Sequence, residues 1–315
     1  MGPFQWLQIR FGGVRRRGNG RDRLDNINYA YILLGVITVL GATWKLISKP
    51  SGKPPVVIVT TLDESKFTKA FTQTIKENRV QYAARHGYET YFPKVDEYDL
   101  KGAPASWAKV VAMRHAMTLF PDAAYFWFLD HDSFVMNPLL RIEEHVMKPA
   151  RLESLMMKDH PVVPPDSIIK TFGHLKGQDV DFVLTQDKDG LSVSSFIIRN
   201  GEWALFFFET WFDPIYRSYN FQKAEAHALE HIVQWHPTIL SKLALIPQRI
   251  INSYNKDGKG EAYKDGDIAI RSSMQTPRHD VPFDQSPSSL ARAPLRPERK
   301  RVAEYMHHKN FARGG

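Results

Sequence analysis

Two aspartates directly follow a strongly apolar segment of the chain. Residues 125–129 read Tyr-Phe-Trp-Phe-Leu, and Asp130, His131 and Asp132 come next. Aspartate is disfavoured in strands and in buried positions, so carboxylates placed here require a partner. Residues two apart on an extended backbone project to the same face, which predicts that Asp130 and Asp132 hold one ligand while His131 points away. Paired carboxylates suit Mg²⁺ or Mn²⁺, which also bind the phosphates of a nucleotide.

Two other interpretations of these aspartates remain open. The first is a strand followed by an Asp-rich turn, since Asp stabilises turns through its own backbone. The second is a metal-dependent phosphohydrolase that uses an Asp-x-Asp nucleophile. The continuous apolar run before Asp130 favours a fully buried strand and therefore favours the metal interpretation.

The charge of the chain does not indicate a nucleic-acid partner. The 315 residues carry a net charge of +8, but six Arg against two Asp lie in residues 1–28 and nine basic against four acidic residues lie in 271–315. The remaining middle of the chain is close to neutral. A basic excess confined to the two ends gives no folded basic face, so nucleic-acid binding is not expected.

An apolar segment near the amino terminus predicts a membrane anchor. The 18 residues 27–44 carry no charge, and aromatic residues lie at both ends. We expect a transmembrane signal-anchor over residues 27–47, with 1–26 as a basic cytosolic tail under the positive-inside rule and 48–55 as a stem. A cleaved signal peptide is the alternative, although the stretch lacks a small-x-small cleavage site. A short span suits the thinner membranes of the early secretory pathway.

Strand and helix patterns alternate along the folded part of the chain. Alternating strands and helices predict a parallel α/β sheet, in which ligands bind at the carboxyl ends of the strands. Thr60 and Thr61 end the first predicted strand, so they are expected beside Asp130 and Asp132. The predicted strands cover residues 56–61, 88–92, 124–129 and 195–199, and the predicted helices cover 67–86, 106–120, 202–212 and 224–234.

Four segments carry a resemblance to a known family. They are residues 106–109 leading to Arg114, 127–137, 195–203 and 228–237. Together they resemble glycosyltransferase family 34, which includes fungal mannan α-1,6-mannosyltransferases, fission-yeast α-galactosyltransferases and plant xyloglucan α-xylosyltransferases. The likeness spans roughly residues 55–270. Residues 213–220 are most similar to the fungal α-1,6-mannosyltransferase complex subunits.

The resemblance implies a fold, an activity and a location. The fold would be a GT-A type, Rossmann-like mixed α/β sheet flanked by helices, over residues 56–270 and preceded by the single transmembrane helix. The activity would be retaining transfer of mannose from GDP-mannose, with Mn²⁺ or Mg²⁺, to the α-1,6-mannan backbone of N-glycans. A UDP-galactose-dependent α-galactosyltransferase is an alternative. The location would be the Golgi membrane, as a type II protein in a hetero-oligomer with related subunits.

The resemblance also implies roles for particular residues. Asp130 and Asp132 match the metal-binding pair, and Lys109 and Arg114 match basic residues beside the donor diphosphate. Glu225 matches one acid of a pair that lies near the reacting sugar. An exposed, purely structural Glu225 is an equal alternative, because the second acid of that pair is Ala226 here.

The end of the chain departs from the family pattern. Family members close the metal site with a histidine after a strand like residues 267–270, whereas this chain continues with Arg271 and a segment rich in Pro, Ser and Arg. We therefore predict a disordered or aberrant tail over 271–315. His279 lies in that tail and is not assigned as a ligand. A weakened or non-catalytic subunit is the alternative function that this departure supports.

Overall fold

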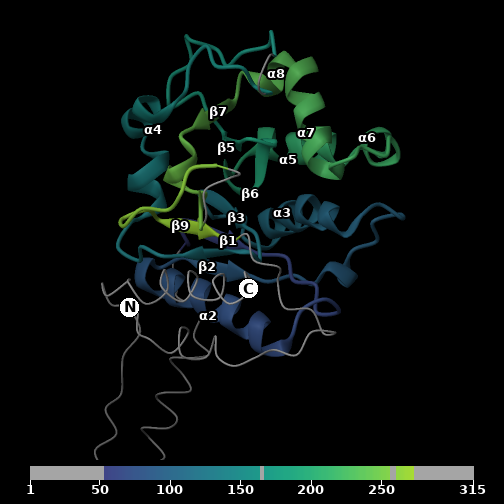
Figure 1. Ribbon diagram of the computed structural model, residues 1–315, viewed down its shortest axis with the longest axis vertical. Coiled ribbons are helices and arrows are strands. Elements are labelled where there is room, and N and C mark those ends of the chain that lie inside the picture. The colour runs from purple at the N-terminus through teal and green to yellow at the C-terminus, as the bar shows by residue number, and fades with distance from the viewer. Residues whose placement is uncertain (1–52, 164–166, 256–259, 273–315) are drawn as a thin grey trace, which may run out of the picture. The chain divides into compact units, whose positions relative to one another are not determined.

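A six-stranded sheet forms the centre of the part of the chain that the structure describes. The structure is a computed structural model, and it describes residues 53–163, 167–255 and 260–272. The strand order is β2-β1-β3-β6-β5-β7 (Figure 1). The strands of this sheet are β1 (Val56–Val59), β2 (Glu89–Tyr91), β3 (Tyr125–Leu129), β5 (Phe182–Asp187), β6 (Gly190–Arg199) and β7 (Leu243–Ile246).

The sheet is mixed, and the parallel sheet predicted from the alternation of strands and helices is wrong for β6. β1 runs parallel to β2 and β3, and β7 runs parallel to β5, but β6 is antiparallel to both of its neighbours. The cause is the hairpin between β5 and β6, where Asp187 pairs with Gly190. Two residues can reverse a chain but cannot cross over to a parallel strand. The turn needs Gly190, whose φ is +120°. The mixed sheet that the family resemblance implies is confirmed.

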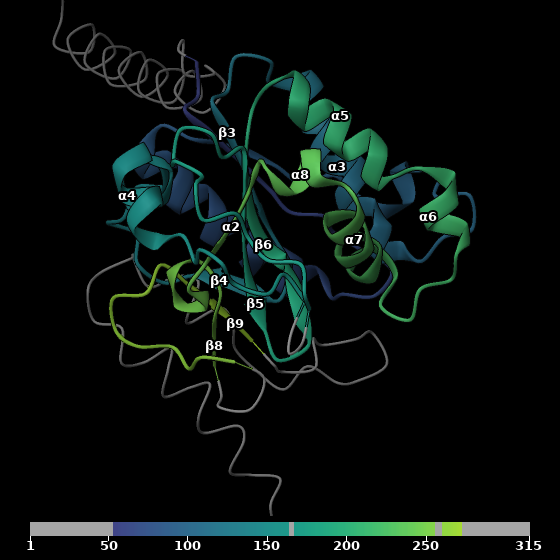
Figure 2. The ribbon, with the colours of Figure 1, turned by 90° about the horizontal axis from the view of Figure 1, so that it is seen from above.

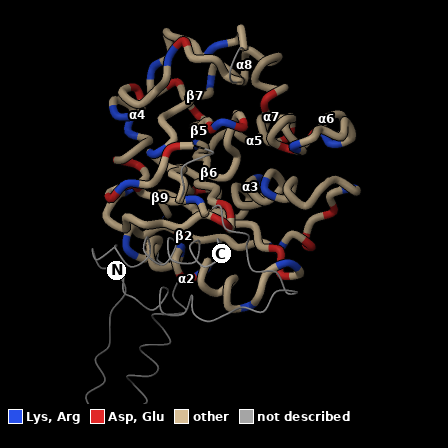
Figure 3. The backbone as a smooth tube through the Cα atoms, viewed as in Figure 1, with Lys and Arg blue, Asp and Glu red and all other residues tan. Residues whose placement is uncertain are grey.

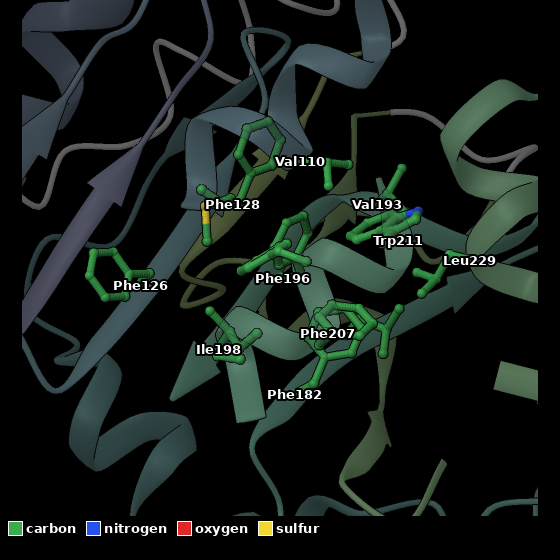
Figure 4. Close-up of a cluster of buried hydrophobic side chains, with 14 of the residues drawn as sticks. Val110, Phe126, Phe128, Phe182, Val193, Phe196, Ile198, Phe207, Trp211 and Leu229 are labelled. Carbon is green, nitrogen blue, oxygen red and sulfur yellow. The ribbon is translucent and has the colours of Figure 1, made fainter. Parts of the chain in front are cut away.

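Apart from the edge strand β2, the strands of the large sheet are buried on both faces over most of their length. In β3, Phe126 and Phe128 enter one apolar cluster, and Trp127 and Leu129 enter a second cluster on the opposite face. Figure 4 shows part of the first cluster, with Phe128 and Phe196 close together. Burying a side chain of this size contributes about 1.5–3 kcal/mol relative to leaving it exposed. A strand with such a sequence therefore folds only as an inner strand of a covered sheet.

Helices cover the two faces of the sheet. The cluster with Phe126 and Phe128 lies under α3, α5 and α7, and the cluster with Trp127 and Leu129 lies under α2 and α4. Figure 2 shows the strands between these two groups of helices. The helices are α2 (Lys69–His86), α3 (Ala108–Leu119), α4 (Pro149–Leu155), α5 (Glu202–Trp211), α6 (Pro214–Ser218), α7 (Ala224–Trp235) and α8 (Pro237–Leu240).

Helix α2 begins and ends where local sequence signals place its ends. The hydroxyl of Thr68 caps the first turn by accepting from the Phe71 amide. Gly87 ends the helix in a left-handed conformation with φ of 69°. The prediction of a helix that stops at Gly87 is therefore confirmed, as are the strands and helices predicted around β1, β2, β3, α3, α5 and α7.

A small second sheet lies beside the carboxyl end of β3. It contains β4 (Ser133–Val135), β9 (Ala269–Arg271) and β8 (Ser253–Tyr254), in the order β4-β9-β8. The antiparallel register of β4 and β9 sets Arg271 opposite Ser133. The predicted boundary after Ile270 thus falls inside β9, because backbone pairing with β4 continues through Arg271. The rest of the predicted tail, residues 273–315, lies outside the described residues.

The predicted anchor lies outside the described residues as well. Residues 1–52 hold the predicted cytosolic tail, the transmembrane segment and most of the stem, and the structure does not describe them. Within the described ranges, no helix combines the length and the apolar composition that crossing a bilayer requires.

Candidate active site

The two aspartates lie in a tight turn between β3 and β4. The Asp130 amide donates to the Ser194 carbonyl at 2.8 Å, and the Ser133 amide donates back to the Asp130 carbonyl at 3.1 Å. The prediction that His131 points away is wrong, because its Nδ1 lies 2.7 Å from Asp130 Oδ1. The alternation of an extended strand ends at Leu129, and the turn brings neighbouring side chains together.

A buried arginine of α2 donates hydrogen bonds to the backbone of this turn. The Arg79 side chain is fully buried, and its Nη2 donates to the Asp130 carbonyl at 2.8 Å and also to the Ser133 carbonyl. Burial lowers the pKa of Arg79 to about 9, against the opposing pull of Asp132 and Asp130. The guanidinium is therefore still charged at neutral pH. It fixes the backbone of the turn, and Asn78 beside it bonds the β4 backbone at Val135.

Lys109 lies between two carboxylates that are distant in sequence. Its Nζ is 2.9 Å from Glu225 Oε1 and 3.5 Å from Asp130 Oδ2. The short turn before α3 buries Trp107, which directs Lys109 in the first turn of α3 toward the end of β3. Burial lowers the pKa of the Lys109 ammonium, but Glu225 and Asp130 outweigh it and keep that pKa above its usual value.

Asp130 is ionised despite its burial. Burial raises the pKa of Asp130, but Lys109 and His131 outweigh this effect and hold the pKa well below its usual range. Conversely, burial lowers the pKa of His131, and the Asp130 carboxylate more than compensates, so that pKa is raised. The site therefore keeps full charges in a region largely shielded from water.

Glu225 has one oxygen that pairs with no described group. Its side chain is buried at the start of α7, and Oε2 has no hydrogen-bond partner among the described residues, whereas Oε1 bonds Lys109. The preceding Ala224 has φ of +45°, which non-glycine residues rarely adopt. Strain of this kind is typical of functional sites. The alternative of an exposed Glu225 is therefore wrong.

Asp132 pairs with an arginine that the sequence analysis did not assign. Arg271 Nε donates to Asp132 Oδ2 at 2.9 Å, and Arg271 Nη1 donates to the Tyr254 hydroxyl at 2.9 Å. The Tyr254 hydroxyl donates to Asp187 Oδ2 at 2.7 Å. Burial lowers the pKa of Arg271, but Asp132 outweighs it and the pKa is raised.

Three predicted site residues make other contacts. Arg114 points to the surface and pairs with Glu209 of α5 at 2.7 Å, and both side chains are more than half exposed. The Thr60 hydroxyl donates to the Leu129 carbonyl at 2.7 Å, which ties β1 to β3. Thr61 is buried next to it. The structure thus brings Lys109, Asp130 and Glu225 together, and it places Arg114 apart from them.

We call the charged side chains around the turn the charge cluster. Its three carboxylates lie among three cationic side chains, and His131 contacts Asp130. Figure 3 shows acidic and basic segments next to one another between α3 and β9. The members of the cluster are Arg79, Lys109, Asp130, His131, Asp132, Glu225 and Arg271.

The cluster suits a divalent cation only together with phosphate. Among the described residues, no three His, Cys, Asp or Glu side chains converge in a way that would hold a metal alone. Mg²⁺-type cations, however, need only one or two carboxylates when phosphate oxygens and water complete the shell. A bound diphosphate adds about two negative charges to a cluster that is already balanced, and a divalent cation offsets them. Asp130 and Asp132 therefore fit the chemistry of such a cation.

Two charged residues that contact the aspartate turn were missed, although the sequence holds a signal for each. Arg79 follows Phe71 and Ile75 at helical spacing, so it is a charged residue on the buried face of α2. Arg271 ends a short apolar strand in the same way that Asp130 does. A charge at either position needs a partner, and the sequence does not show which residue that partner is.

Comparison with known proteins gives the class. Residues 52–273 match the model of the galactosyl transferase GMA12/MNN10 family, which is a glycosyltransferase family. The match covers well over half of the chain, including every member of the charge cluster. The chain belongs to this family.

Individual relatives are fungal hexosyltransferases. The chain is 34% identical to an uncharacterized alpha-1,2-galactosyltransferase of Schizosaccharomyces pombe, over 66% of this chain and 57% of the relative. It is 30% identical to the probable alpha-1,6-mannosyltransferase MNN11 of Saccharomyces cerevisiae, over 70% of this chain and 58% of the relative. The chain thus spans less than two thirds of the length of either protein.

The chain has a weak similarity to a solved structure. That structure is a glycosyltransferase involved in the glycosylation of the major capsid of PBCV-1, with a TM-score of 0.48 and 14% sequence identity. The match covers 81% of this chain and 100% of that chain.

Proposed function

We propose that the chain is a retaining glycosyltransferase that moves a hexose from a nucleotide-sugar donor to a glycan. The observation that carries the proposal is Lys109, a buried ammonium held between Asp130 and Glu225 at the carboxyl end of β3. Ligands of open α/β sheets bind at such carboxyl ends. Membership of the family agrees with this assignment.

The finer proposal is transfer of mannose from GDP-mannose to the α-1,6-mannan backbone of N-glycans, in a GT-A fold. The likeness to the probable alpha-1,6-mannosyltransferase MNN11 supports it. UDP-galactose is the second candidate donor, because the alpha-1,2-galactosyltransferase relative is 34% identical. A Golgi location, a type II anchor at residues 27–47 and a hetero-oligomer with related subunits remain part of the proposal.

Two residues would act on the donor directly. Lys109 would offset the negative charge that develops on the departing diphosphate, in a site where few waters compete. The Oε2 of Glu225, which has no partner in the described part of the chain, would accept a hydrogen bond from a hydroxyl of the transferred sugar, or stabilise positive charge at its anomeric carbon. An acceptor hydroxyl that attacks on the face the diphosphate leaves would retain the anomeric configuration. The Asp130 and Asp132 carboxylates would hold a Mn²⁺ or Mg²⁺ ion, which supplies further positive charge to the leaving group.

A transfer assay with matched aspartate variants tests the proposal. The full chain is incubated with Mn²⁺, α-mannobiose and either GDP-mannose or UDP-galactose, and the trisaccharide is measured by chromatography. We expect Asp130→Asn to lower transfer at least about 100-fold, in line with loss of a charge at a reacting centre. Asp181→Asn is the control, because Asp181 pairs with Arg199 and Lys242 away from the charge cluster.

Two results would argue against the proposal. Equal transfer by wild type and Asp130→Asn, with equal melting temperatures, would remove Asp130 from the chemistry. Fast release of phosphate from a nucleotide sugar without any acceptor would favour the phosphohydrolase interpretation instead.

A further inference from the structure

Arg271 forms an ion pair with Asp132, the carboxylate that a divalent cation would need. It contacts Asp132 through Nε and the Tyr254 hydroxyl through Nη1. Tyr254 is itself held by Asp187 at the end of β5, and the Arg271 guanidinium lies 5.5 Å from the Tyr254 ring centroid. The backbone of β9 fixes the same end, because the Ser272 amide donates to the Asp132 carbonyl at 2.8 Å. Several elements therefore hold this guanidinium on Asp132.

The guanidinium also keeps a donor group for a ligand. Nη2 of Arg271 makes no hydrogen bond to any described residue, and the side chain is 27% exposed. Arginine binds phosphate oxygens through its planar set of N–H donors. Asp132 thus orients an arginine whose remaining donors suit a diphosphate.

A divalent cation and Arg271 compete for the same carboxylate. Both carry positive charge, and at contact distance like charges in a partly buried site repel strongly. Bound phosphate changes this competition, because its oxygens are negatively charged like Asp132 and can pair with Arg271 in its place. The diphosphate oxygens would accept hydrogen bonds from Arg271 and, together with Asp132, coordinate the cation.

We propose that Arg271 is a diphosphate-binding residue that excludes the cation from the free protein by holding Asp132. When the nucleotide binds, Arg271 moves from Asp132 to the phosphates, and Asp132 becomes available to the cation. The inference rests on the proposed function, since it requires a nucleotide diphosphate at this site. Its consequence is that cation and nucleotide bind together, each raising the affinity of the other.

Calorimetric titration of the full chain tests both halves of the inference. Mn²⁺ is first titrated into nucleotide-free wild type and Arg271→Gln, and we expect at least about tenfold tighter binding to the variant because a competing charge is gone. GDP and UDP are then titrated in saturating Mn²⁺. Here we expect the variant to bind at least about tenfold more weakly, because it lacks the arginine contact to phosphate.

Arg199→Gln is a closely matched control. Arg199 also pairs with an aspartate, Asp181, at 3.1 Å, and it also lies 5.5 Å from a tyrosine ring centroid, that of Tyr125. On β6 it lies opposite Tyr125, which is at the other end of β3 from the charge cluster. We expect this variant to bind Mn²⁺ and nucleotide as wild type does. Melting temperatures establish that each variant is folded.

A milder variant covers the case in which Arg271→Gln does not fold. Arg271→Lys keeps the charge but lacks the planar guanidinium that bonds Asp132 and Tyr254 through two separate nitrogens, so both changes are expected in the same directions and smaller, about threefold.

The outcomes separate the inference from the proposed function. Tighter Mn²⁺ binding together with weaker nucleotide binding supports the inference, and either change alone overturns it while the proposed function stands. Tight Mn²⁺ binding by the nucleotide-free wild type also overturns it. If neither GDP nor UDP binds wild type in Mn²⁺, the proposed function fails and the inference fails with it.

Discussion

At the scale of single residues, Lys109 decides which charges of the site can coexist. It is the partner of Glu225 and a partner of Asp130, so it allows two carboxylates to be ionised next to each other. Without a cation between them, carboxylates in a shielded site repel and one takes up a proton. The same ammonium lies 5.4 Å from the Phe128 ring centroid, which gives it an apolar wall on one side.

Glu225→Gln tests the role of the unpaired carboxylate oxygen. Glutamine preserves the size of the side chain but removes the negative charge next to Lys109, so we expect kcat for transfer to fall about 100-fold with little change in folding. Initial rates at saturating donor measure it. Glu209→Gln, which changes an exposed partner of Arg114, is the control and keeps wild-type kcat. An unchanged kcat in Glu225→Gln would show that its charge does not act in the reaction.

A second, partly buried glutamate gives a prediction on pH. Burial raises the pKa of Glu230 above its usual value, although the Leu191 amide and His227 oppose the shift. The stability that this group contributes is present below its unfolded pKa and is lost as pH rises through its folded pKa. Glutamine at this position still accepts from the Leu191 amide and carries no charge. We therefore expect Glu230→Gln to stabilise the protein near neutral pH and not in acid.

Melting temperatures at two pH values measure this effect. We expect the Glu230→Gln variant to melt at a higher temperature than wild type at about pH 7, because burial disfavours the charged form of Glu230. At about pH 4, below the unfolded pKa, the two proteins should melt together. A difference of equal size at both pH values would mean that the charge of Glu230 is not responsible.

At the scale of elements, the ends of helices and strands bring the site residues together. Asp130 directly follows β3, Lys109 and Glu225 are the second residues of α3 and α7, and Arg271 is the last residue of β9. Element ends are the places where charged side chains replace apolar ones, so a site assembled from ends can be charged while the sheet stays apolar. Arg79 is the exception, since it reaches the turn from within α2.

The end of α2 offers a prediction on stability alone. Gly87 has φ of 69°, and no atom lies within 4 Å of the position that a side-chain methyl group would occupy, so alanine there would suffer only backbone strain. We expect Gly87→Ala to cost about 1 kcal/mol, seen as a lower melting temperature, with unchanged nucleotide affinity. Gly201→Ala is the control, because Gly201 is extended and equally uncrowded. A neutral Gly87→Ala would mean that the helix can end in another conformation.

At the scale of the whole described domain, one sheet separates two apolar layers. Consecutive residues of the central strand β6 belong to different layers: Ile198 packs with the α3, α5 and α7 side, and Ile197 packs with the α2 and α4 side. Within the charge cluster, Asp130 to Asp132 directly follow β3 of this sheet. Whether the two layers contribute independently to the free energy of unfolding can be measured.

Double-mutant analysis of this pair tests the layered arrangement. Ile197→Val and Ile198→Val each remove one buried methylene group and should cost about 1 kcal/mol in the free energy of unfolding. Because the two side chains share no packing partners, the double variant should cost the sum, within about 0.5 kcal/mol. Chemical denaturation of the three variants measures this. A clear departure from additivity would show that the layers are coupled through the sheet.

Sequence alone determined the local elements and half of the site. Uninterrupted β-branched and aromatic runs predicted β1 and β3, a glycine predicted the end of α2, and the apolar run before Asp130 singled out the aspartates. These features depend on residues close in sequence, where periodicity and backbone preference act directly. The resemblance to the family added Lys109 and Glu225.

Only the tertiary structure decided how the charges pair. The contacts of Asp132 with Arg271 and of Asp130 with Lys109 join residues 139 and 21 positions apart in the chain. The antiparallel course of β6 likewise follows from its hairpin with β5, since the apolar pattern of a buried strand is the same in either direction. Pairings of this kind depend on which strand ends meet in space, and the pattern of residues close together in the sequence does not specify those contacts.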